Sequence, residues 1–71
     1  MTDPPKLETM IARLTRDPAY RMELTAQLSA RTLDPETIDR LILYARGRDS
    51  TLAKAMVRKV LTDAGVSWEA L

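Results

Sequence analysis

The sequence predicts an all-α fold, a compact bundle of four short helices followed by a C-terminal turn. Three of the four prolines directly follow an aspartate, giving Asp3-Pro4, Asp17-Pro18 and Asp34-Pro35. A proline behind a capping aspartate is typical of a helix start, and Gly47 and Gly65 stand where helices would end. No segment alternates apolar and polar residues as a half-buried strand does, so we expect no sheet. The expected helices span residues 4–15, 18–30, 35–46 and 51–64.

Length and composition predict one small helical domain over residues 1–71. The chain has 45% hydrophobic and 30% charged residues, a globular balance. A domain of this size buries only about 60% of its unfolded surface, so its core is thin. There is no cysteine, no apolar run reaches the roughly 18 residues that span a bilayer, and residues 1–5 do not resemble a signal peptide. We therefore expect a soluble, cytoplasmic protein with no membrane partner.

The helix expected at 4–15 has one apolar face, formed by Leu7, Met10, Ile11 and Leu14. These residues follow the i, i+3, i+4, i+7 spacing of an amphipathic helix. The face predicts a stripe that packs into the core.

The helix expected at 18–30 has two apolar faces. One consists of Tyr20, Leu24 and Leu28. The other lies on nearly the opposite side and consists of Ala19, Met22, Ala26 and Ala30. The first interpretation is a central helix that packs on both sides. The alternative is that the second face contacts a partner, because small residues permit close approach and methionine adapts to varied surfaces.

The helix expected at 35–46 buries Ile38, Leu41, Ile42 and Ala45, with Leu33 as a hydrophobic staple before the cap. Leu43 projects away from this face among charged residues. It is either a single exposed leucine, which is common, or an interface anchor.

The helix expected at 51–64 has the widest apolar face and should be the main core helix, with Asp49 or Ser50 as its cap. We expect Gly65 to adopt the left-handed conformation that ends many helices, followed by a hydrophobic contact of Val66. Trp68 would fold back onto the core, where its indole N–H needs a partner or water. The apolar face consists of Leu52, Ala53, Met56, Val57, Val60, Leu61 and Ala64.

Residues 40–59 are strongly basic, with six basic residues against one acidic residue and hence a net charge of +5, whereas the whole chain carries +1. Such a segment favours an acidic partner or a phosphate backbone, although a merely solvated face is the simpler interpretation. Lys54 and Arg58 are one helical turn apart, so we expect them to project together. A helix-turn-helix-like site for DNA or RNA, which would read through residues 51–64, would use Arg46, Arg48, Lys54, Arg58 and Lys59.

The sequence gives little support to an enzyme. It lacks histidine and cysteine, the commonest general bases, nucleophiles and metal ligands. Several carboxylates are expected to cap helices, and no calcium or phosphate-binding loop has the required spacing. We predict no catalytic residue, no metal and no cofactor.

The favoured hypothesis is a small regulator that binds a larger protein, as an adaptor, inhibitor or assembly factor of the kind that phages and mobile elements encode. Nucleic-acid binding is the alternative. Because the core is thin, a homodimer is a further expectation under either hypothesis. The residues proposed to contact a protein partner are Met22, Ala26, Arg40, Leu43, Arg46 and Arg48.

Overall fold

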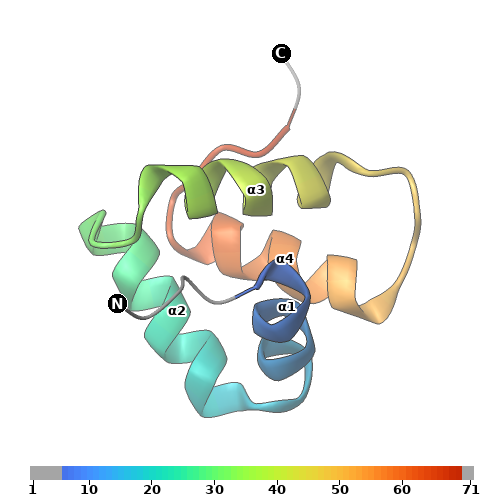
Figure 1. Ribbon diagram of the computed structural model, residues 1–71, viewed down its shortest axis with the longest axis horizontal. Coiled ribbons are helices and arrows are strands. Elements are labelled where there is room, and N and C mark those ends of the chain that lie inside the picture. Colours follow the sequence, from blue (N-terminus) through green and yellow to red (C-terminus); the bar gives the residue numbers. More distant parts are fainter. Residues whose placement is uncertain (1–5, 70–71) are drawn as a thin grey trace.

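The computed structural model describes residues 6–69 and shows an all-α bundle of four helices, as the sequence predicted (Figure 1). Over this described range, no helix has the length and apolar character needed to cross a membrane. The helices are α1 (Leu7–Arg16), α2 (Pro18–Ala30), α3 (Pro35–Arg46) and α4 (Leu52–Asp63).

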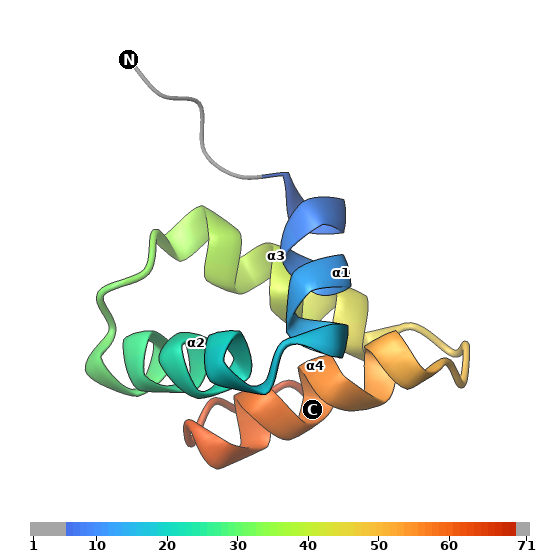
Figure 2. The same cartoon turned by 90° about the horizontal axis from the view of Figure 1, so that it is seen from below.

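Helix α4 is the central element: it packs against each of the other three helices, and more extensively than α1, which also contacts three helices. In Figure 1, α3 crosses the top of the bundle, with α1 and α4 beneath it and α2 at the lower left. Seen from below in Figure 2, α2 and α4 lie side by side and run in the same general direction. Helix α2 therefore lies at the edge of the bundle, with one side turned outward.

The core forms where the apolar faces of the four helices meet. Helix α1 contributes Met10, Ile11 and Leu14, while Leu7 is half-buried at the margin, which confirms the predicted face. The other buried apolar residues are Leu24, Leu28, Leu41, Ala45, Val57, Val60, Leu61 and Val66.

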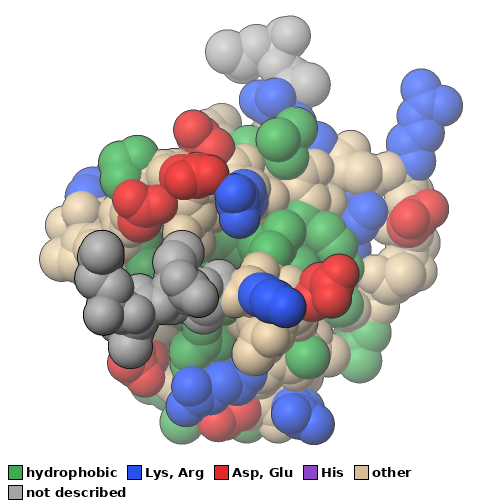
Figure 3. All heavy atoms as spheres, viewed as in Figure 1, with side chains coloured by type: hydrophobic (Ala, Val, Ile, Leu, Met, Phe, Trp, Pro, Cys, Tyr) green, Lys and Arg blue, Asp and Glu red, His purple; other side chains and the backbone are tan. Residues whose placement is uncertain are grey.

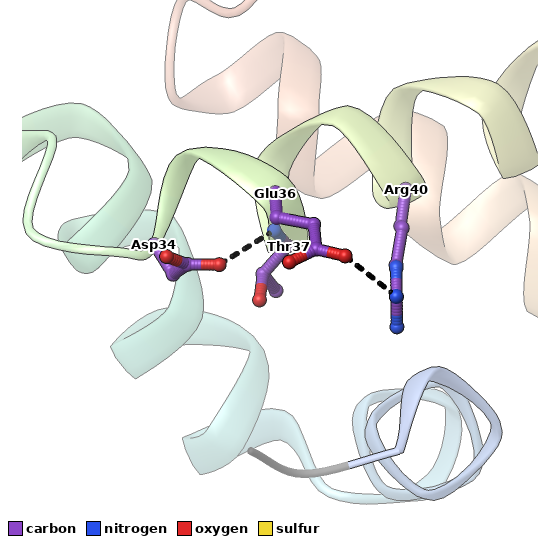
Figure 4. A network of polar contacts seen from close by, with 4 residues as sticks. All are labelled: Asp34, Glu36, Thr37 and Arg40. Carbon is purple, nitrogen blue, oxygen red and sulfur yellow. Dashed lines mark hydrogen bonds and ion pairs between the residues drawn. The ribbon is translucent and has the colours of Figure 1, made fainter.

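Two of the Asp-Pro steps cap helices as predicted. The Asp17 carboxylate accepts hydrogen bonds from the backbone N–H groups of Ala19 and Tyr20, at 3.1 and 3.3 Å. The Asp34 carboxylate accepts one from the N–H of Thr37 at 3.3 Å (Figure 4). Because both aspartates satisfy orphan donors of a first helical turn, they fix where α2 and α3 begin.

The other two helix starts differ from the prediction. Helix α1 begins at Leu7, after an extended Lys6 that provides no side-chain cap, and Asp3-Pro4 lies outside the described residues. Helix α4 is capped by Thr51, whose hydroxyl accepts the N–H of Lys54 at 3.1 Å. The expectation of Asp49 or Ser50 as this cap is wrong, because the helix begins at Leu52 and only Thr51 directly precedes it.

Both glycines follow helices, but for different reasons. Gly65 has the left-handed φ of 75°, and the N–H of Val66 donates to the carbonyl of Leu61 at 2.8 Å, which confirms the predicted end of α4. Gly47 has an ordinary φ of −59°. It is needed for space instead, since a Cβ there would overlap the ammonium of Lys54.

Candidate functional site

The second apolar face of α2, formed by Ala19, Met22, Ala26 and Ala30, is exposed to solvent, and we call it the α2 outer surface. Met22 is 74% exposed, the highest value among the large hydrophobic side chains of residues 6–69. The interpretation of α2 as a helix that packs on both sides is therefore wrong. Leu24 and Leu28 meet the core, whereas the residues of the other face are exposed because α2 lies at the edge of the bundle.

A groove of about 520 Å³ separates the α2 outer surface from α4. Its apolar lining includes Met22 and Ala26 of α2 and Val60 of α4. On the α4 side, Lys59 and Asp63 face each other at 3.7 Å, with both side chains more than half exposed. The complete lining consists of Pro18, Arg21, Met22, Thr25, Ala26, Ser29, Lys59, Val60 and Asp63.

Two arginines at the corner between α1 and α2 have structural roles, Arg21 on α2 and Arg13 on α1. The guanidinium of Arg21 donates to the carbonyls of Leu14 and Thr15, at 2.9 and 3.2 Å, and so satisfies the C-terminal end of α1. Arg13 lies over the ring of Tyr20, with its guanidinium carbon 4.4 Å from the ring centroid. Burial raises the pKa of the Tyr20 phenol above its ordinary value, against a smaller lowering by Arg13.

The exposed side of α3 carries Leu43, which is 68% exposed, and we call this side the α3 outer surface. Acidic side chains gather over the first half of the helix (Figure 3). There Glu36 pairs with Arg40, whose guanidinium donates to the carboxylate at 2.7 Å (Figure 4). Arg46 ends the helix and Arg48 follows in the connection to α4, and both are exposed, so charge changes sign along this surface.

Lys54 and Arg58 project together, as expected, but toward the end of α3, so the expectation that Lys54 forms part of an exposed nucleic-acid face is wrong. Lys54 is only 5% exposed, the sole buried charged residue within the described range. Its ammonium lies 4.9 Å from the centroid of the Tyr44 ring and packs against Gly47 at the end of α3. The face of an aromatic ring and the negative end of a helix dipole both attract a cation, which accounts for this position.

Arg58 is held by the same end of α3. Its Nε donates to the carbonyl of Ala45 and its terminal nitrogen to that of Gly47, both at 2.9 Å. The last carbonyls of a helix lack intrahelical partners, so a guanidinium from the next helix is a suitable donor. Arg58 thus joins α4 to α3.

Trp68 folds back onto the core, as predicted, and its indole N–H donates to the hydroxyl of Thr62 at 3.1 Å. The guanidinium of Arg58 lies over the ring, 5.1 Å from its centroid, and Nε of Arg46 donates to the Trp68 carbonyl at 3.0 Å. The C-terminal segment is therefore tied to both α3 and α4.

The basic segment divides accordingly into two groups. Lys54 and Arg58 stabilise the junction of α3 and α4, whereas Arg46, Arg48 and Lys59 are exposed. The structure thus does not bring the five residues proposed for nucleic acid together on one open face. It also separates the residues proposed for a protein partner, with Met22 and Ala26 on α2 and the others on or beside α3.

Sequence reasoning did not identify the α4 side of the groove. Lys59, Val60 and Asp63 lie thirty or more positions from the α2 residues that line the groove with them, and a helical periodicity does not show which helices become neighbours. Residues 6–69 contain no group of three or more acidic side chains suited to a metal ion. Comparison with protein-family models, curated proteins and solved structures gave no match.

Proposed function

We propose that this chain is a small, non-enzymatic, cytoplasmic regulator that binds a larger protein through the α3 outer surface. The observation that supports the proposal most strongly is Leu43, a large apolar side chain that is 68% exposed on a helix whose other face supplies the core. An apolar side chain that gives nothing to the core gains most from burial against a partner.

The helix that presents Leu43 is fixed at both ends. Asp34 caps the first turn of α3, and Arg58 satisfies the carbonyls of Ala45 and Gly47 at the last turn. A side chain on a rigid element loses little conformational freedom when it binds, so such a surface is preorganised. The position of Leu43 on this helix supports its role as an anchor.

The charges around Leu43 favour a partner with an acidic surface. Arg40 is already paired with Glu36, so its charge is largely balanced. Arg46 and Arg48 supply positive charge on the C-terminal side of Leu43. We propose that the partner offers an apolar pocket for Leu43 with carboxylates beside it, an arrangement that would speed association at low salt.

Affinity capture from the native host, with nuclease present, tests the proposal. Leu43→Glu should remove the captured protein, because it places a carboxylate where the apolar anchor and an acidic partner would meet. Leu52→Glu is the matched control, since Leu52 is 65% exposed at the start of α4, and it should retain that protein. Retention of the same protein by Leu43→Glu would contradict the proposed surface.

A further inference from the structure

We propose that the groove between α2 and α4 is a self-association surface, which a second copy of this chain occupies around a two-fold axis. This surface is separate from the α3 outer surface, and the inference does not depend on the function proposed above. It rests on the pattern of size and charge among the residues that line the groove.

The groove is lined by one side of α2 and by one side of α4. On α2 its lining extends from Pro18 to Ser29, and Met22 and Ala26 stand on either side of the middle. On α4 its lining consists of Lys59, Val60 and Asp63, which belong to the last turns of the helix. Because α2 and α4 lie side by side and run in the same general direction (Figure 2), one axis can cross α2 between Met22 and Ala26 and the end of α4 between Lys59 and Asp63.

A two-fold axis through these midpoints exchanges the members of each pair. Met22 of one copy then lies on Ala26 of the other, so that a long side chain meets a short one. Lys59 of one copy similarly meets Asp63 of the other, so that opposite charges face each other. In a two-fold interface one patch must be complementary to itself, and both pairs meet this condition.

The charge pattern favours a second copy over a charged partner. Within one chain the Lys59–Asp63 pair is long, at 3.7 Å, and the two side chains are 66% and 52% exposed. Such an exposed pair contributes little, so exchanging it for two pairs between copies costs little. On the α2 side of the lining the charged residue is Arg21, whose guanidinium is already held by the carbonyls of Leu14 and Thr15, so this side offers little to a charged partner.

Sedimentation equilibrium over a range of concentrations measures the association directly. The wild-type chain should pass from its monomer mass of 8.0 kDa to twice that value as concentration rises. Met22→Glu should remain monomeric, with a dissociation constant raised at least about a hundredfold, since it would bury an unpaired carboxylate. Leu43→Glu is the control on the other surface and should associate like the wild type. Circular dichroism would verify that each variant is helical.

Charge exchange tests the two-fold geometry. Lys59→Glu alone places two carboxylates opposite each other, and Asp63→Lys alone places two lysines there, so each variant should associate about tenfold more weakly. An equimolar mixture of the two variants restores opposite charges at both contacts and should regain the wild-type mass average.

Three results would overturn the proposal. They are a wild-type chain that stays monomeric at every concentration, a dimer that survives Met22→Glu, and a mixture of charge variants that associates no better than either variant alone. Each leaves the proposal about Leu43 intact, because that surface is tested by capture of a different protein.

Discussion

The α2 outer surface and the junction of α3 and α4 differ in how the fold uses their side chains. At the junction, Lys54 and Arg58 turn inward to the C-terminal end of α3, where carbonyls and an aromatic ring receive them. On α2, Met22 and its alanine neighbours are exposed, and Met22 and Ala26 line the groove beside α4. These two cations thus contribute to the stability of the fold, while apolar side chains of α2 remain available at its surface.

The reason for the difference lies in what each region leaves unsatisfied. A helix end has orphan carbonyls and a partial negative charge, and both attract the nearest guanidinium or ammonium. The outer side of an edge helix has no unsatisfied backbone groups of this kind, and a small core cannot bury a second apolar face of the same helix. A basic cluster beside a helix C-terminus is therefore weaker evidence for a binding site than an apolar face on an edge helix.

The largest expected effect comes from removing Arg58. Arg58→Ala deletes the donors to the Ala45 and Gly47 carbonyls and the guanidinium over Trp68, and should lower the free energy of unfolding by about 2 kcal/mol. Lys59→Ala, the adjacent exposed cation, should change it by less than about 0.5 kcal/mol. Urea denaturation would measure both, and equal effects would contradict the structural role of Arg58.

A smaller effect is expected at Gly47. Gly47→Ala pushes the Lys54 ammonium away from the Tyr44 ring and should cost about 1 kcal/mol. The same change made in a Lys54→Met background should cost less, because the methionine carries no ammonium at this point. A double-mutant cycle measures this coupling, and strict additivity of the two changes would show that the overlap with Lys54 is not the cause.

A substitution at the end of α2 should raise the free energy of unfolding by an amount similar to or smaller than the loss at Gly47. Arg31 adopts a left-handed backbone, with φ of 59°, at a position where helices usually place glycine. Arg31→Gly should raise the free energy of unfolding by about 0.5–1 kcal/mol, because glycine adopts this conformation without strain. Ala26→Gly, inside the same helix, should instead lower it by about 1 kcal/mol. Thermal unfolding of both variants should show shifts of opposite sign.

The smallest expected effect is a pH dependence at Tyr20. Because burial raises the pKa of its phenol in the folded state, the folded chain holds this proton more tightly than the unfolded chain. The resulting stability is present below the ordinary pKa of 10.0 and is lost as pH rises through the raised value. Tyr20→Phe should therefore lose less stability than the wild type between neutral pH and pH values above about 10. If the free energy of unfolding falls equally with pH in the wild type and in Tyr20→Phe, the raised pKa of Tyr20 is not the cause of the pH dependence.

The sequence was sufficient to predict the four helices, because their apolar periods and two of the aspartate caps are local features. It also predicted that the main core helix is the last one and that Trp68 folds back. The environment of Lys54 and Arg58 was not predictable, since it depends on where the carbonyls of α3 lie relative to α4. The periodicity of α2 showed two apolar faces, but only the position of the helix at the edge determines which one the core uses.

The contrast between the two regions is tested most directly by urea unfolding of Arg58→Ala, Met22→Glu and the wild type. The fluorescence of the single tryptophan reports the unfolding, at a concentration where the chain is monomeric. We predict a clearly lower midpoint for Arg58→Ala and an unchanged midpoint for Met22→Glu, because the first side chain holds two helices together and the second contacts solvent. A lower midpoint for Met22→Glu with an unchanged one for Arg58→Ala would contradict the account.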